Sequence, residues 1–296
     1  MALDPITQFD LNRLRANNYT RKSFKIKPAL SSRYLGSLAS ISTREISALV
    51  EGLSASDLTK DIFTEESYNS SLNFVRNTNF WGKDIIGITG ISPWNSRADF
   101  KRAGTAITPR HVLFCEHSNF HLSRGHKIYF VTRDNTLVTR EVKEQIDHPD
   151  TGFNLGDFNI AVLDEDLPDT IEVLKVLPED ALNYYEEVAT YGAFDPPAGE
   201  PFYAFWVDQE EKGLIKQIGQ IKTLYPGTQN EVTSIKFSFT TGTPVEDWWE
   251  SAIIHDSGSP AFILLNNEAI LVTVTTGPTW GNGTFISTPK IINDLN

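Results

Sequence analysis

Three stretches of this sequence carry side chains that could together perform nucleophilic catalysis. In IIHDSGSPAF, a tight Asp-Ser-Gly turn could present Ser257 as a nucleophile, although the same tripeptide is common in ordinary turns. A serine hydroxyl needs a base near neutral pH, and His117, which follows the apolar run VLFC, could accept its proton. Asp157, which precedes the apolar run FNIAVL, could orient that imidazole. These residue types predict an activated serine, provided that the fold brings them together.

The segments around these residues are predicted to be β-strands. After Trp81 the sequence consists of short apolar runs separated by turn residues, a pattern typical of antiparallel sandwiches and barrels. The runs are IIGITGI, GTAITP, HVLFCEH, KIYFVTRD, TLVTREV and FNIAVL, and then EVATYGAF, FYAFWV, IKQIGQIKTL, EVTSIKFSF, PAFILL and EAILVTVTTG. An acidic connection with prolines separates the two series near residue 175. We therefore predict a first β unit over residues 81–175 and a second over residues 176–296.

Residues 1–80 are predicted to form a helical N-terminal extension. Ser42 and Glu45 have the Ser-x-x-Glu spacing of a capping box, which predicts that a helix begins there. Apolar residues follow at helical spacing, namely Ile46, Leu49, Val50 and Leu53. A second helix is predicted over residues 65–77. The pattern leaves three roles open for this extension: a partner-docking module, a propeptide or a brace packed on the β units.

Composition excludes several classes of function. The chain has 296 residues and a formal net charge of −12, so a nucleic-acid partner, which needs a basic surface, is not expected. No apolar run is long enough for a signal peptide or a membrane span, so membrane insertion is not expected and a cytoplasmic location is compatible with the sequence. Cys115 is the single cysteine, which excludes an intramolecular disulfide.

The three stretches resemble the catalytic motifs of the chymotrypsin-like (trypsin-fold) serine proteases. GTAITPRHVLFCEHS is similar to the family's segment that ends in Ala-Ala-His, and GDFNIAVLDEDLP to its Asp-Ile-Ala-Leu-Leu-x-Leu strand. IHDSGSP resembles Gly-Asp-Ser-Gly-Gly-Pro, and the order His, Asp, Ser is that of chymotrypsin. The resemblance covers roughly residues 85–290 and identifies a divergent, disulfide-free member. It implies two antiparallel β-barrels, with His117 and Asp157 in the first and Ser257 in the second.

This resemblance implies a serine endopeptidase that hydrolyses peptide bonds through an acyl-enzyme. The substrate would be a peptide or protein, no cofactor or metal is required, and the oligomeric state is left open. The oxyanion would be bound by the backbone N–H groups of Ser257 and His255, although the family has glycine at the second position. In the zymogens, the aspartate before the serine pairs with a newly formed N-terminus. Here IIG at 85–87 is too near His117 for that role, so Asp256 needs another partner.

The resemblance also implies a substrate pocket. Its floor would be Ser251, and its walls would include Gly277 and Gly283. A neutral floor between glycines would admit a bulky apolar side chain. Glu250 is adjacent to that floor, and a shift of the alignment by one residue would instead favour Arg or Lys.

The same residues allow other interpretations. The main alternative is a catalytically weak or inactive protease-fold binding protein, because His255 replaces a glycine. Clustered cysteine and histidine side chains could bind zinc, although their spacing fits no usual site; they are Cys115, His117, His121 and His126. Cys115 itself could be a nucleophile, and Asn159 could replace Asp157 beside the histidine.

Overall fold

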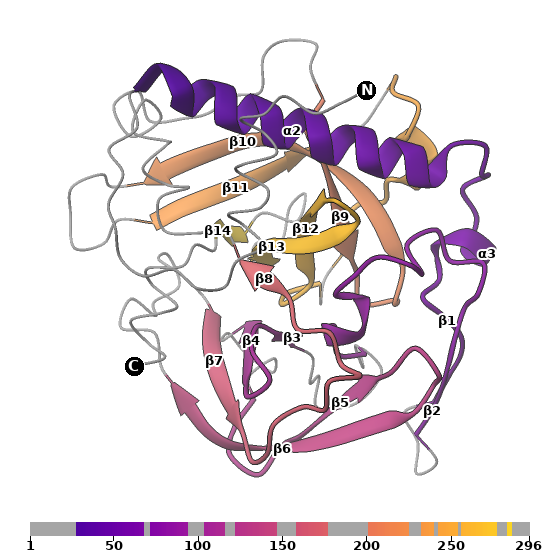
Figure 1. Ribbon diagram of the computed structural model, residues 1–296, viewed down its shortest axis with the longest axis vertical. Coiled ribbons are helices and arrows are strands. Elements are labelled where there is room, and N and C mark those ends of the chain that lie inside the picture. Colours follow the sequence, from indigo (N-terminus) through magenta and orange to yellow (C-terminus); the bar gives the residue numbers. More distant parts are fainter. Residues whose placement is uncertain are drawn as a thin grey trace.

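The computed structural model shows a chain that is mostly β-sheet with few helices, in which a long helix lies across one end of the strands (Figure 1). The N-terminal helix α2 spans Pro28–Val50, and the short helix α3 spans Asp57–Lys60. The structure describes residues 28–67, 72–93, 104–115, 122–146, 158–176, 201–224, 232–239, 242–253, 256–276 and 283–285.

The strands of the second unit form a closed cycle of antiparallel pairs. They are β9 (Tyr203–Val207), β10 (Gly213–Leu224), β11 (Val232–Ser238), β12 (Pro260–Leu265), β13 (Glu268–Thr275) and β14 (Gly283–Phe285). The order is β12-β9-β10-β11-β14-β13, and β13 pairs back with β12, so the sheet curls until its two sides meet. The short strand β8 (Lys175–Val176) adds to β13 in parallel. This closure satisfies the edge hydrogen bonds that an open sheet would leave exposed.

Among the described residues, the first unit repeats the same strand order without a strand that closes the sheet. Its strands are β3 (Thr105–Ala106), β4 (His111–Cys115), β5 (Lys127–Val131), β6 (Leu137–Ile146) and β7 (Phe158–Leu163), paired in the order β3-β4-β7-β6-β5. In both units two strands that are consecutive in the chain pair with each other: β10 with β11, and β3 with β4. The last strand of the unit, β14 or β7, comes next in the sheet, and the other strands follow in reverse chain order. Ile91 bridges to Thr105 beside β3, the place that β9 takes beside β10.

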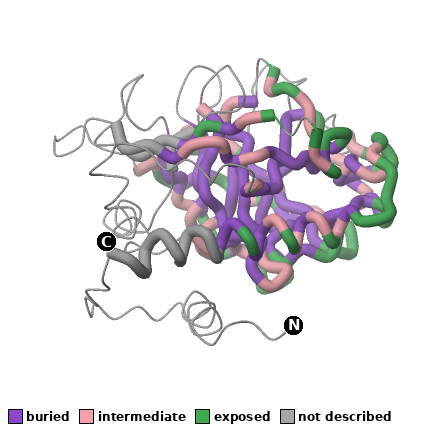
Figure 2. Tube along the Cα trace, turned by 90° about the horizontal axis from the view of Figure 1, so that it is seen from above, coloured by how far each residue is buried: buried purple, intermediate pink, exposed green. Residues whose placement is uncertain are grey.

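Helix α2 packs on the second unit through its apolar side. Leu38 and Ile41 join one buried cluster with Trp206, and Ile46 and Val50 join a second, which includes Phe205. Neighbouring residues of β9 therefore belong to different clusters, and every residue of that strand is buried. Buried residues fill the interior of the described chain, and exposed residues lie along its outside (Figure 2). Of the four apolar residues at helical spacing, Ile46 and Val50 are buried and Leu49 is half-buried, whereas Leu53 is 44% exposed.

The predicted capping box at Ser42 and Glu45 is wrong, because both residues lie inside α2 rather than at its start. Their side chains instead bind the second unit. The Glu45 carboxylate accepts hydrogen bonds from the backbone N–H groups of Asn266 and Asn267, at 2.8 and 2.9 Å, in the β12–β13 turn. Both turn residues have positive φ, so their amides are turned out of the sheet ladder and need such an acceptor.

Ser42 bridges β9 and β12 where these strands no longer pair directly. Its fully buried hydroxyl donates to the Tyr203 carbonyl at 2.8 Å and accepts from the Leu264 N–H at 3.0 Å. We expect Ser42→Ala to destabilise the protein by about 1–3 kcal/mol, because two buried backbone groups lose their partner. Chemical denaturation would measure this, with Ser40→Ala on the exposed side of the same helix as the control. Equal stability of the two variants would contradict the bridging role.

Two further sequence predictions are wrong. The helix predicted over residues 65–77 is replaced by a hairpin of β1 (Phe63–Ser67) and β2 (Asn73–Arg76), in which the Phe63 and Phe74 rings pack with centroids 5.6 Å apart. Packing of those rings outweighs a weak helical periodicity. The segment 85–91 is not a regular strand, because Gly87 has φ of +104° and a 3-10 helix follows it. The Arg76 guanidinium fastens the hairpin to the first unit through the Val131 and Thr132 carbonyls.

No helix in the described part of the chain has both the length and the apolar character that a membrane crossing needs.

Candidate functional site

Ser257 lies on a tight turn that leads directly into β12. The Ser259 N–H donates to the Asp256 carbonyl at 2.9 Å, and Gly258 has φ of +93°, a backbone conformation that glycine adopts without strain. The turn is fastened to the end of β13, because Gly258 N–H donates to the Thr275 carbonyl at 2.7 Å and Thr275 N–H donates to the Ser259 carbonyl at 2.8 Å. Ser257 is only half-buried, whereas its two neighbours are buried. These hydrogen bonds fix the backbone of the turn, and the Ser257 side chain is partly exposed on it.

The buried carboxylate of Asp256 holds this turn through hydrogen bonds to the backbone. Its side chain is 2% exposed and accepts hydrogen bonds from the backbone N–H groups of Ile253, at 2.6 Å, and Gln209, at 3.2 Å. Burial raises the pKa of Asp256 to about 6, while the two amide hydrogen bonds and the charge of Lys216 oppose that rise. The hydrogen-bond partners of the Asp256 carboxylate are therefore two backbone amides.

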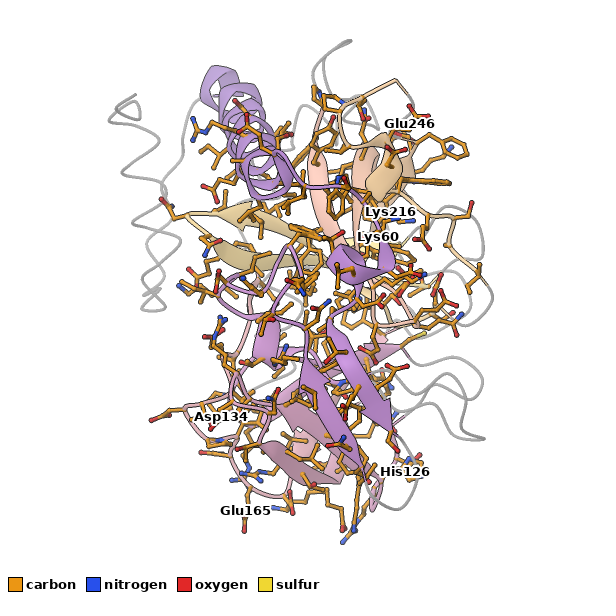
Figure 3. All side chains as sticks on the ribbon, turned by 90° about the vertical axis from the view of Figure 1, so that its right-hand side faces the viewer. Lys60, His126, Asp134, Glu165, Lys216 and Glu246 are labelled. Carbon is orange, nitrogen blue, oxygen red and sulfur yellow. The ribbon has the colours of Figure 1, made fainter. Side chains whose placement is uncertain are left out.

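Lys216 is a fully buried lysine in the middle of β10 (Figure 3). Its ammonium donates to the Glu250 carbonyl and lies 4.0 Å from the centroid of the Trp206 ring and 5.0 Å from that of Trp249. Burial lowers the pKa of Lys216 to about 8, against the opposing charges of Asp256, Asp208 and Glu250. The aromatic faces and the carbonyl take the place of water around this cation.

A second buried carboxylate, Asp208, lies after β9 in the turn that also contains Gln209. Burial raises its pKa to about 7, although its Oδ1 accepts hydrogen bonds from the N–H groups of Glu210 and Lys212, each at 2.9 Å. The nearby charge of Asp256 raises that pKa further. The charges of Asp256 and Asp208, which lie on two different segments, both oppose the effect of burial on the pKa of Lys216.

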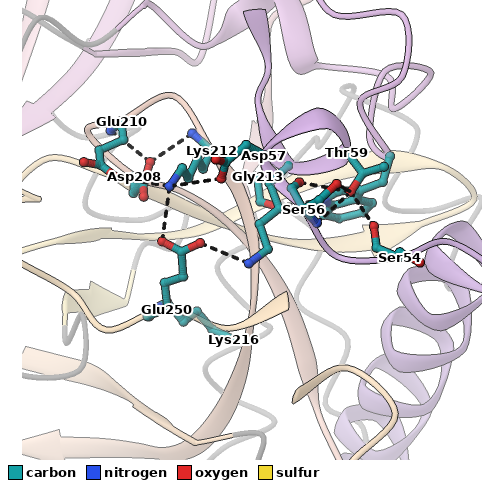
Figure 4. Close-up of polar contacts among 12 residues, drawn as sticks. Ser54, Ser56, Asp57, Thr59, Asp208, Glu210, Lys212, Gly213, Lys216 and Glu250 are labelled. Atoms are coloured by element: carbon teal, nitrogen blue, oxygen red, sulfur yellow. Dashed lines mark hydrogen bonds and ion pairs between the residues drawn. The ribbon is translucent and has the colours of Figure 1, made fainter. Parts of the chain in front are cut away.

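The acidic side chains Asp208, Glu210 and Glu250 have oxygen atoms within 4.8 Å of one another, a spacing that could hold a metal ion. The ammonium groups of two lysines lie beside these carboxylates. The Lys212 ammonium lies 3.2 Å from Glu210 and 3.6 Å from Glu250, and the Lys60 ammonium lies 3.0 Å from Glu250 (Figure 4). Lys60 comes from α3, so this ion-pair cluster also fastens the N-terminal segment to the second unit.

His117 and Asp157 lie outside the described residues. The strands beside them are described, and they are antiparallel neighbours: Cys115, which ends β4, pairs with Phe158, which begins β7. In sequence, His117 follows the end of one strand by two residues and Asp157 precedes the start of the other by one. Asn159, the alternative to Asp157, is buried within β7 opposite Phe114.

A small cleft separates the serine turn from the first unit. Gly104 and Thr105 line it from the β3 side, and Gly258 and Ser259 line it from the turn. Among the described residues, the buried hydroxyl groups of Thr105 and Ser259 have no hydrogen-bond partner. The serine turn therefore borders the same hairpin, β3–β4, that leads toward His117.

The remaining predicted site residues are only partly described. His255 and Gly277 lie outside the described residues, and Gly283 belongs to β14, where it pairs with Ile235 and Thr275. Ser251 is exposed. The neighbouring Glu250 carboxylate already pairs with Lys60 and Lys212, so its charge is compensated within the protein.

The structure bears on the cysteine alternatives as well. Cys115 is 1% exposed within β4, so its thiol is not accessible as a nucleophile. His126 Nδ1 accepts a hydrogen bond from the Ser123 N–H at 3.1 Å, a local contact within its own turn. His117 and His121, the other members of the zinc alternative, lie outside the described residues.

Sequence reasoning missed Lys216 and Asp208 as members of this region. The only signal was a lysine inside the apolar strand GLIKQIGQIKTL, where Leu214, Ile215 and Lys216 are all buried in succession.

Comparison with protein-family models and with curated proteins finds no match to this chain.

Proposed function

We propose that this protein is a serine endopeptidase with the two-barrel fold of the chymotrypsin-like proteases and that His117, Asp157 and Ser257 form its catalytic triad. The observation that carries the proposal is the half-buried Ser257 on a turn held by the buried Asp256. The next two residues of that turn, Gly258 and Ser259, line a small cleft together with Gly104 and Thr105. A surface turn would not need a buried carboxylate and two strand contacts to fix one serine.

The repeated strand order supports the two-barrel part of the proposal. The second unit closes on itself, and the first has the same order with Ile91 bridged beside β3 in the position that β9 takes in the second unit. Two units of similar structure would pack against each other, and loops from both units would lie along the boundary between them. The pairing of Cys115 with Phe158 supports a base and an orienting acid that come from adjacent strand ends of the first unit.

The proposed chemistry is acyl transfer. Ser257 Oγ attacks the carbonyl carbon of the scissile peptide bond while His117 accepts its proton, and Asp157 stabilises the imidazolium that forms. His117 then protonates the leaving amine, which departs as the acyl-enzyme forms. Water activated by the same imidazole adds to the ester, and the serine leaves with its proton restored. The developing oxyanion would be bound by the backbone N–H groups of Ser257 and His255.

The substrate pocket proposed from the resemblance has Ser251 as its floor and Gly277 and Gly283 as walls. Because Lys60 and Lys212 compensate the charge of Glu250, the proposed preference is for an apolar side chain rather than for Arg or Lys. Hydrolysis rates of matched peptide substrates that differ only in that side chain would test the preference.

Labelling with a fluorophosphonate probe tests the proposed function directly. We expect the wild-type protein to be labelled at Ser257 and the Ser257→Ala variant to be unlabelled, because the probe reacts only with an activated serine. Ser259→Ala is the matched control, since Ser259 is a buried serine two residues away, and it should still be labelled. Folded wild-type protein that is not labelled would overturn the proposal and favour an inactive protease-fold binding protein.

A further inference from the structure

We infer that Glu250 is a positioning residue, which connects the segment before Ser257 to three lysines on other parts of the chain. Through Lys60, the contact also makes the N-terminal segment part of the support of the serine turn. This positioning can be measured without any enzymatic assay. Only its catalytic consequence rests on the proposed function.

Three ammonium groups converge on Glu250. Its Oε1 lies 3.0 Å from the Lys60 ammonium, and its Oε2 lies 3.6 Å from the Lys212 ammonium (Figure 4). The Lys216 ammonium donates to its backbone carbonyl. These lysines belong to α3, to the turn between β9 and β10, and to β10 itself. One residue is therefore held by three separate elements, of which α3 is 190 residues away in the chain.

The segment 249–253, which contains Glu250, depends on such contacts for its position. It belongs to no helix or strand, because the 3-10 helix Glu246–Trp248 ends just before it and β12 begins only after the serine turn. Its backbone groups therefore need partners other than a strand ladder. The Glu250 carbonyl accepts from an ammonium, and the Ile253 N–H donates to Asp256 Oδ2 at 2.6 Å. These contacts fix both ends of the stretch that leads to the serine turn.

The lysines that hold the Glu250 carboxylate are themselves fixed by backbone contacts. Directly after Lys60, Asp61 bridges to Lys212, so the N-terminal segment and the β9–β10 turn are joined beside both ammonium groups. The Lys60 side chain is 10% exposed and that of Glu250 is 32% exposed, so salt screens this pair less than a pair on the open surface. Removal of the Glu250 charge would leave the Lys60 ammonium largely buried without its carboxylate, which is costly.

The test compares Glu250→Gln with Glu210→Gln, because both carboxylates pair with Lys212 but only Glu250 belongs to the segment before the serine turn. Glutamine removes the charge and keeps the backbone carbonyl. In Glu250→Gln we expect hydrogen exchange at the Ile253 amide to accelerate about tenfold, because two partly buried ion pairs are lost together. Fluorophosphonate labelling of Ser257 should slow by a similar factor. Glu210→Gln should change neither rate.

Exchange in the first unit separates positioning from a merely structural role. In Glu250→Gln the amides of β4 and β7 should exchange as in the wild-type protein, because the change is confined to the segment before the serine turn. A residue that only stabilised the fold would instead accelerate exchange in both units.

Lys60→Met tests the N-terminal side of the contact, and it replaces Glu250→Gln if that variant does not fold. It should accelerate exchange at Ile253 by about threefold, less than Glu250→Gln, because the pair with Lys212 remains. Lys60→Arg keeps the charge and should exchange as the wild-type protein does. Unchanged exchange in Lys60→Met would overturn the role assigned to the N-terminal segment.

Unchanged exchange at Ile253 in folded Glu250→Gln, or equal acceleration in Glu210→Gln, would overturn the inference, whatever the labelling. Faster exchange in Glu250→Gln with unchanged labelling of Ser257 would overturn its catalytic consequence. Faster exchange in Glu250→Gln, together with a wild-type protein that does not label, would support the positioning role and overturn the proposed protease function.

Discussion

Replacement of His117 by alanine is expected to lower kcat for a peptide ester by about 10⁴–10⁶, because Ser257 loses the base that accepts its proton. Steady-state kinetics at saturating substrate would measure this loss. KM should change little, since the imidazole acts mainly in the transition state. His126→Ala is the matched control, because the contact of that histidine with the Ser123 N–H lies within its own turn, and it should leave kcat unchanged.

The combination of His117→Ala with Ser257→Ala makes the same prediction sharper. Residues that act as one unit are strongly non-additive, so the double variant should be about as inactive as either single variant. Losses that multiply would mean that the two residues act independently. A His117→Ala variant with normal turnover would show that another base serves Ser257, and the triad would then be wrongly assigned.

The β-rich character of the chain could be predicted because apolar runs with turn residues between them are a local signal. The predicted runs HVLFCEH, KIYFVTRD and FNIAVL contain strands β4, β5 and β7. The order in which strands pair is not local. β14 pairs with the strand just before it, β13, but nothing in the sequence near β14 shows that it also pairs with β11, because Ile235 and its partner Gly283 are 48 residues apart.

The wrong capping box and the missed Lys216 have a common cause, which is that side chains suited to one local role make a distant contact in the fold. Ser42 and Glu45 have the types and spacing of a helix cap but bind strands more than 150 residues away, as with the Ser42 hydroxyl and Tyr203, separated by 161 residues. Lys216 appears in sequence as a surface lysine of a strand. Its burial depends on Trp206 and Trp249, which only the fold places around it.

Removal of residues 1–50 is expected to abolish folding of the remaining chain. Helix α2 buries Leu38, Ile41, Ile46 and Val50 against the second unit, and each buried side chain of this kind contributes about 1.5–3 kcal/mol. Together they approach the entire stability of an ordinary domain, which is about 5–15 kcal/mol. The shortened chain should therefore be recovered unfolded or aggregated, as circular dichroism and size-exclusion chromatography would show.

Single substitutions on α2 test whether this helix stabilises the folded protein or is needed only while the protein folds. Ile46→Ala should lower the free energy of unfolding by about 2–5 kcal/mol, because Ile46 is fully buried and the cavity would not refill. Arg44→Ala, on an exposed position of the same helix, should change it by less than about 0.5 kcal/mol. Urea denaturation of both variants would measure the difference. If Ile46→Ala were as stable as Arg44→Ala, and the chain from residue 51 folded and labelled normally, α2 would be a removable propeptide. The hydrogen bonds of Ser42 and Glu45 to the second unit argue for a permanent brace.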